Sequence, residues 1–143
     1  VSRGARWAAG SVETDLTAIV QEAERTNPAL VCVASFRTLT RQAADRAPHT
    51  DLDLQRFVQK LAIRLTSWEA TTFLVGEYQP PETEHNAVFT VADGLLWLAQ
   101  SLDRNSIVRK MQVVKMRGQA TITGRHTFRH TGAGVHVFPR VND

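Results

Sequence analysis

The chain has 143 residues, of which 43% are hydrophobic, and its 17 Lys and Arg against 14 Asp and Glu give a net charge of +3. This length suits one ordinary domain, and no run approaches the roughly 18 consecutive apolar residues of a membrane span. The first ten residues lack the apolar stretch of a signal peptide, and a single cysteine, Cys32, excludes an internal disulfide, so we expect a cytoplasmic protein.

The charge is unevenly distributed along the chain. Residues 104–143 contain eight Lys or Arg and one acid, whereas residues 51–103 contain eight acids and three bases. A basic and an acidic segment on one chain indicate either a polyanionic partner or head-to-tail association of identical subunits. A solvated basic face is the simpler alternative, and charge alone favours it.

The first elements are predicted from apolar spacing. Residues 11–26 have the pattern of an amphipathic helix, with Ser11 as its N-cap and Asn27–Pro28 as its end. Residues 29–35 are a short apolar run rich in valine, which predicts a strand buried on both faces. Cys32 lies within this run and is interpreted as a buried structural thiol.

A second helix is predicted to begin near Thr50, where Asp53 completes a sequence similar to a capping box. Apolar residues then recur at helical spacing, at Leu54, Phe57, Val58, Leu61, Leu65 and Trp68. Residues 71–77 predict a second buried strand.

The last third of the chain predicts antiparallel strands. Residues 94–100 and 107–116 form one pair around the turn-like segment 101–106, and residues 125–130 and 135–139 form another. Asp93, just before the first pair, is interpreted as a turn residue. The order of elements therefore predicts an α/β fold in which parallel strands with helices are followed by antiparallel hairpins.

Four segments resemble, in chain order, the C-terminal half of a KaiC-type ATPase domain of the RecA superfamily. They read PALVCVASFRTL, TTFLVGE, VFTVADGLLWL and VVKMRGQATITGRHTFRHTGAGVHVFPR, and the likeness covers roughly residues 12–140. The resemblance implies a partial RecA-like P-loop NTPase fold that lacks the P-loop strand. It also implies that residues 1–143 are a single domain, the C-terminal portion of such an ATPase domain.

The resemblance further implies a role for the K-M-R-G sequence at residues 115–118. Members of this family form rings, usually hexamers, with ATP at each subunit boundary, and act in signalling or clock systems with other signalling proteins. Lys115 and Arg117 would then contact the γ-phosphate bound to the adjacent subunit, as fingers supplied in trans. Residues two apart in a strand share a face, so both cations point the same way. Met116, Gln119, Thr121 and Thr131 match further nucleotide-contact positions.

Three departures from the family pattern bear on activity. The 143 residues contain no G-x-x-x-x-G-K-[ST] sequence, which cradles phosphates and binds Mg²⁺. Ala34 stands where the Walker B Asp helps to hold Mg²⁺, and Thr121 stands where the family has histidine. We therefore expect no ATP or Mg²⁺ on this chain alone and no hydrolysis by it alone. The missing strand would expose an apolar edge, which predicts a fragment of a longer protein or a second chain that covers the edge.

Two other functions compete with this interpretation. A degenerate, non-catalytic oligomerisation or interaction module is favoured by Ala34. Nucleic-acid binding would explain the basic segment, but its bases fall largely within the finger signature. His126, His130 and His136 raise a metal hypothesis, yet no Cys or acid completes the set, so no metal is predicted.

Overall fold

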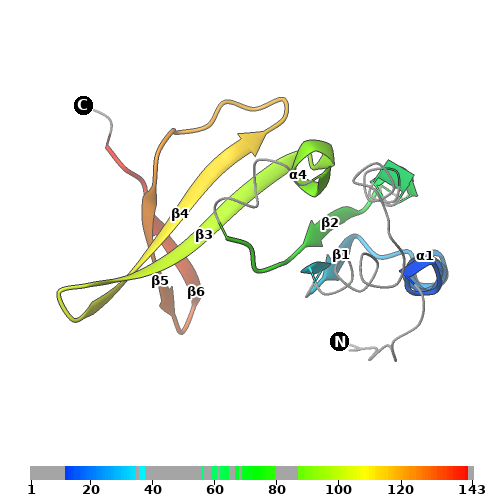
Figure 1. Ribbon diagram of the computed structural model, residues 1–143, viewed down its shortest axis with the longest axis horizontal. Coiled ribbons are helices and arrows are strands. Elements are labelled where there is room, and N and C mark those ends of the chain that lie inside the picture. The colour runs from blue at the N-terminus through cyan, green and yellow to red at the C-terminus, as the bar shows by residue number, and fades with distance from the viewer. Residues whose placement is uncertain are drawn as a thin grey trace. The chain divides into compact units, whose positions relative to one another are not determined.

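The structure is a computed structural model, and the residues that it describes are 12–34, 36–37, 56, 59–60, 62–64, 67, 69–79 and 87–141. They belong to two compact units, Val1–Val91 and Ala92–Asp143, each with its own sheet (Figure 1). Among the described residues, no helix is long and apolar enough to span a membrane. The alternation of helix and parallel strand, followed by antiparallel hairpins, confirms the predicted mixed α/β class.

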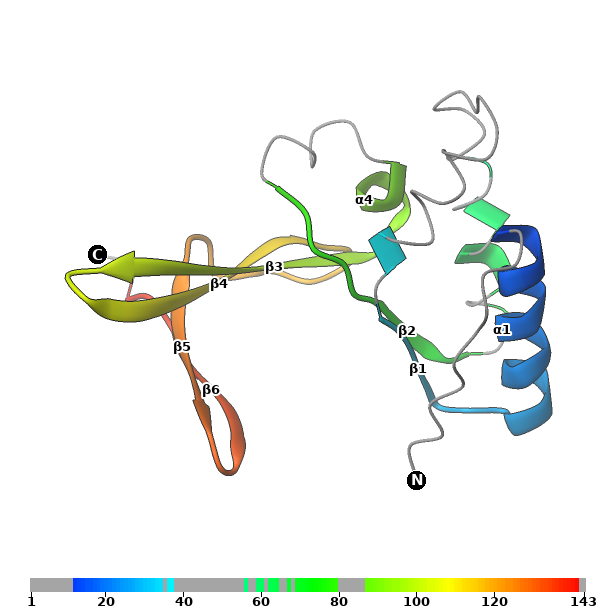
Figure 2. The ribbon, with the colours of Figure 1, turned by 60° about the horizontal axis from the view of Figure 1, so that its bottom comes forward.

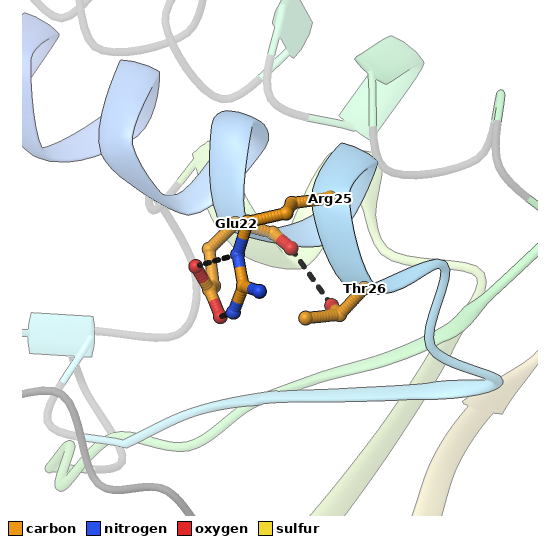
Figure 3. Close-up of polar contacts among 3 residues, drawn as sticks. All are labelled: Glu22, Arg25 and Thr26. Atoms are coloured by element: carbon orange, nitrogen blue, oxygen red, sulfur yellow. Dashed lines mark hydrogen bonds and ion pairs between the residues drawn. The ribbon is translucent and has the colours of Figure 1, made fainter.

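Helix α1, Val12–Thr26, confirms the first prediction and ends where Asn27–Pro28 requires. Val20 and Ala23 form its buried stripe, each 5% exposed. Asn27 has a left-handed φ of 43°, and its N–H donates to Ala23 O at 2.8 Å, so Asn27 caps the C-terminus. Figure 3 shows Thr26 donating to Glu22 O, and Arg25 donating to the Glu22 carboxylate. This carboxylate raises the pKa of Arg25 above its ordinary value by hydrogen bonding and charge. Ser11 lies outside the described residues.

Strands β1, Leu30–Val33, and β2, Thr71–Leu74, pair in parallel, with Val33 opposite Leu74. The pairing continues past the strand ends, because Val75 N donates to Val33 O and Phe36 N donates to Val75 O, both at 2.9 Å. Phe36 is 2% exposed and is the best-buried large side chain described. Figure 2 shows α1 running alongside this pair of strands. Both predicted strands are therefore confirmed.

The prediction that these strands are buried on both faces is wrong. Leu30 is 59% and Phe73 47% exposed, whereas Val33 is 8% exposed. Successive side chains alternate between faces, and the described residues cover only one of the two. Cys32 shares the uncovered face and is exposed, so the interpretation of a buried thiol is also wrong.

The predicted second helix lies mostly outside the described residues, including Thr50, Asp53 and its whole apolar series. Its described positions 56, 59–60 and 62–64 are helical. A short helix that the sequence did not predict, α4, spans Ala87–Val91. Val88 is 6% exposed, and the Phe89 ring meets Tyr78 edge-on at 5.1 Å, so tertiary contacts hold this β-branched segment helical.

The second unit is a four-stranded antiparallel meander in chain order, which contains both predicted strand pairs and joins them through its two central strands. Its strands are β3, Gly94–Asp103; β4, Ser106–Met116; β5, His126–Thr131; and β6, Gly134–Phe138. The first turn is tighter than predicted. Arg104 and Asn105 have φ of 44° and 65°, the left-handed pair of a two-residue hairpin turn, so both strands extend into the expected loop.

The two hairpins of this unit are joined by a narrow contact between β4 and β5. Only Lys110 with Thr127 and Met111 with His126 are paired. The unit's buried side chains lie at this junction: His126 is 5% and Phe128 7% exposed. The pairing at this junction therefore sets the register of β4 against β5.

Candidate functional site

The register of β3 and β4 decides which way Lys115 points. Leu95 lies opposite Lys115, but Leu96 lies opposite Val113, so Val114 is an extra residue that makes a β-bulge. In an antiparallel pair, opposite residues share a face, so Lys115 lies on the face of Leu95. The same rule puts Gln112 opposite Trp97 on that face. Without a bulge, simple alternation from Gln112 would place Lys115 on the other face.

Arg117 is anchored to Asp93 by both backbone and side chain. Its N–H donates to Asp93 O at 2.7 Å, which extends the ladder one pair beyond Gly94 and Met116. Its Nη1 donates to Asp93 Oδ1 at 2.8 Å, with the side chains 63% and 67% exposed. Asp93 and Leu95 are two residues apart, so their partners Arg117 and Lys115 lie on the same side of the hairpin. The structure thus supports the same-face arrangement expected from the K-x-R spacing.

Gly118 turns the chain immediately after Arg117. Its φ is 76°, in the left-handed region that a residue with a Cβ rarely adopts. A Cβ at this position would meet nothing within 4 Å, so the backbone conformation, not crowding, selects glycine. The turn ends β4 directly beyond the two cations and leaves Gln119 and Thr121 in an exposed segment that leads to β5.

Thr131 is not brought to the same place. β4 and β5 are antiparallel, so β4 continues from the junction toward Lys115 in the direction that leads back along the chain from His126 to Thr121. β5 continues from the junction toward Thr131 in the opposite direction. Its hydroxyl serves the β5–β6 turn, donating to Gly134 O at 3.1 Å and accepting from Ala133 N at 3.3 Å. Of the six nucleotide-contact positions that the resemblance predicts, Lys115, Met116, Arg117, Gln119 and Thr121 follow one another at the end of β4, and Thr131 lies away from them.

Ala34 directly follows β1 and is exposed. It occupies the carboxyl end of a parallel strand, the edge where α/β proteins place ligands. A methyl group offers no oxygen to a cation, so this position does not fit Mg²⁺. No three His, Cys, Asp or Glu side chains gather as a metal site among the described residues.

The buried histidine has a structural role. His126 Nδ1 accepts from Arg140 N at 2.9 Å, and Nε2 lies 3.1 Å from Ile122 O. His130 meets Phe128 edge-on, and His136 stacks on Phe138 at 4.5 Å. The hydrogen-bond partner of Arg117 that the sequence did not predict is Asp93, which was interpreted only as a turn residue. Asp93 lies two residues before Leu95, which pairs with Lys115, so a known hairpin register would have identified Asp93 as the cross-strand partner of Arg117.

Comparison with known proteins places the chain in a family. The fold is similar to that of a KaiC-like protein from the hyperthermophilic archaeon Pyrococcus horikoshii, with a TM-score of 0.71 and 19% identity over 90% of this chain. The model of the KaiC ATPase family matches residues 8–142, and the chain belongs to this family. No curated protein matches the chain.

The archaeal structure is considerably longer than the region that it shares with this chain. The match covers 57% of the archaeal chain. The likeness at this identity shows the fold, which confirms the predicted similarity to a KaiC-like, RecA-type domain.

Proposed function

We propose that this chain contributes Lys115 and Arg117, in trans, to ATP bound by an adjacent subunit of a cytoplasmic, KaiC-type homo-oligomer of signalling or clock type. The observation that carries the proposal is the pairing of Lys115 with Leu95 and of Arg117 with Asp93, which puts both cations on one side of the hairpin end. Family membership supports ATP as the nucleotide. A ring of six subunits is the arrangement that the family resemblance implies.

The two cations suit the chemistry of phosphoryl transfer. This reaction is catalysed mainly by positive charge placed around oxygens that gain negative charge. Asp93 takes one N–H of Arg117 through Nη1, and a guanidinium has five donors, so further donors remain for phosphate oxygens. The hydrogen bond from the Arg117 backbone N–H to Asp93 O fixes the backbone at Arg117, which limits the positions that its side chain can reach. Lys115 adds a compact charge on the same side.

The residues of this chain do not supply a complete nucleotide site. Ala34 provides no metal ligand, and the 143 residues contain no P-loop sequence. The adjacent subunit of a homo-oligomer carries the same Ala34, so the groups that hold its phosphates would come from residues outside these 143, and no Mg²⁺ is placed at this position. Met116, Gln119 and Thr121 are proposed as additional contacts to that nucleotide. Thr131 is left out, because its hydroxyl serves its own turn and it lies in the other direction along the sheet.

The test is ATP hydrolysis by the native assembly carrying Lys115→Gln or Arg117→Gln. A finger residue supplied in trans is worth about 10³-fold or more in kcat, so Arg117→Gln should abolish most turnover. Arg109→Gln is the matched control, because Arg109 is on the same strand but pairs with Gln100, on the opposite face. Mixed assemblies should lose activity with the fraction of Arg117→Gln subunits. Full turnover by an all-variant assembly would refute the proposal.

A non-catalytic interaction module is the second candidate, and Ala34 is the observation that favours it. In this case Lys115 and Arg117 would link subunits through a bound nucleotide without turnover. Sedimentation with a non-hydrolysable ATP analogue separates the two functions: nucleotide-dependent assembly together with no measurable hydrolysis supports the module. Hydrolysis that Arg117→Gln removes supports the catalytic function.

A further inference from the structure

A hollow lies within the second unit. It has a volume of about 780 Å³ and opens between β4, the ends of β5 and β6, and the segment that leads into β5. Polar and aromatic side chains line it: Lys110, Gln112, Arg125, Thr127, Phe138 and Arg140. Neither finger residue belongs to this lining.

The charges around the hollow are all positive. Lys110, Arg125 and Arg140 line it, and no Asp or Glu does. None of the three makes an ion pair with any carboxylate among the described residues. Like charges that share one concave surface repel, and they raise the local concentration of anions. A cluster that has no counter-ion among the described residues is suited to an anionic ligand.

The strand register places three of the lining side chains on one face. Lys110 lies opposite Thr127, and Thr127 lies opposite Phe138, so three neighbouring strands present these side chains on one face. Lys110 Nζ donates to Thr127 Oγ1 at 2.7 Å, which keeps the ammonium within the hollow. Lys110 is half-buried and retains two further N–H donors.

The buried side chain of His126 connects the two chain segments at the edge of the hollow. Its Nδ1 accepts the Arg140 N–H, so the neutral ring carries its proton on Nε2, which donates to Ile122 O. One imidazole thus joins the segment before β5 to the segment after β6. Gly124 has a φ of 100°, and a Cβ there would lie 3.4 Å from Arg140 Nη1, so the Arg140 guanidinium lies over this glycine.

We propose that this hollow, lined by Lys110, Arg125 and Arg140, is an anion site that binds a chain of two or more phosphates. Two guanidinium groups suit bidentate contacts to phosphate oxygens, and Lys110 adds a point charge. The hollow is in the size range of small-molecule sites, about 300–1,000 Å³, and is too large for one phosphate. Phe138 and Pro139 give an apolar wall for an attached ring. A free nucleotide and a nucleic-acid backbone share this phosphate chemistry.

The experiment is a calorimetric titration of the full 143-residue chain with tripolyphosphate at low ionic strength. Wild type is compared with Arg125→Gln and Arg140→Gln, which alter exposed side chains and leave the Arg140 N–H in place for His126. Each should weaken binding about tenfold, because each removes a charge-assisted contact. Arg109→Gln is the control for net charge, since it changes the same strand on the opposite face. Amide shifts of Gln112 and Thr127 by NMR report the location of the ligand independently of affinity.

The double variant Lys115→Gln/Arg117→Gln separates this site from the proposed finger function. Tripolyphosphate binding that survives in the double variant and falls in Arg125→Gln supports the proposal. ATP binding tighter than tripolyphosphate identifies a free nucleotide as the source, and tighter binding of single-stranded oligonucleotide identifies a nucleic acid. The absence of binding, an equal loss in Arg109→Gln, complete loss in the double variant, or preference for an acidic peptide would each overturn it.

Discussion

The contact between Arg117 and Asp93 gives a prediction that can be tested without any ligand. Asp93→Asn and Arg117→Gln each remove one charge and keep the backbone bond from Arg117 N to Asp93 O. Because the two side chains are 63% and 67% exposed, water and salt screen their attraction. Exposed ion pairs of this kind contribute about 0.2–1 kcal/mol in double-mutant cycles. We expect the coupling free energy between Asp93 and Arg117 to fall in this range.

The magnitude matters for function. A coupling below about 1 kcal/mol lets a phosphate replace Asp93 as the partner of Arg117 at a cost of at most about fivefold in affinity. Asp93 would then hold the guanidinium loosely near its place of action and still release it to an anion. A much stronger pair would keep Arg117 in its own subunit.

The assay is urea unfolding of the wild type, both single variants and the double variant. Amide signals of β3 and β4 are followed by NMR, so that the second unit is observed separately from the first. In about 1 M salt, where the screening length is about 3 Å, the coupling should nearly vanish. A coupling above about 3 kcal/mol that persists in salt would show instead that Arg117 is a structural residue held firmly by Asp93.

Three further substitutions test the local physics. Gly118→Ala should lower the free energy of unfolding by about 1 kcal/mol because of its left-handed φ, and Gly118→Asn should cost less; equal values in thermal melts would contradict this. Asn27→Ala should destabilise α1 by about 1 kcal/mol, as measured by circular dichroism, whereas Asn27→Gly should be neutral or stabilising. If Asn27→Ala stabilises the helix, the left-handed C-cap at Asn27 is unimportant. His126→Ala should lower the unfolding free energy by about 2–4 kcal/mol, since it leaves the N–H of Arg140 and the carbonyl of Ile122 without their buried partner; an unchanged urea midpoint would exclude this role.

Elements with a strong local signal were predictable from the sequence. Asn27–Pro28 can end a helix by itself, and valine-rich or alternating runs define β1, β2 and the two hairpins. The short helix α4 was missed, because five residues with three β-branched side chains have no helical signal of their own. Its conformation depends on the burial of Val88 and on the contact between Phe89 and Tyr78, which are tertiary.

The candidate site was predictable only in part, for a similar reason. The K-M-R-G sequence identifies Lys115 and Arg117, but the bulge at Val114 and the partnership with Asp93 depend on cross-strand register. Burial of β1 on both faces was predicted from composition, yet composition cannot show whether a second layer covers a strand. The exposure of Cys32 follows from that missing cover.

Lys115 and Arg117 are proposed to reach a nucleotide on a neighbouring subunit. The most direct measurement is photo-crosslinking of the native assembly with an ATP analogue that carries an aryl azide on the γ-phosphate, followed by mass spectrometry. We predict labelling of the segment that contains residues 115–121, with loss of this label in Arg117→Gln and its retention in Arg109→Gln. Labelling confined to other segments, or unchanged labelling in Arg117→Gln, would show that these two residues do not reach the nucleotide.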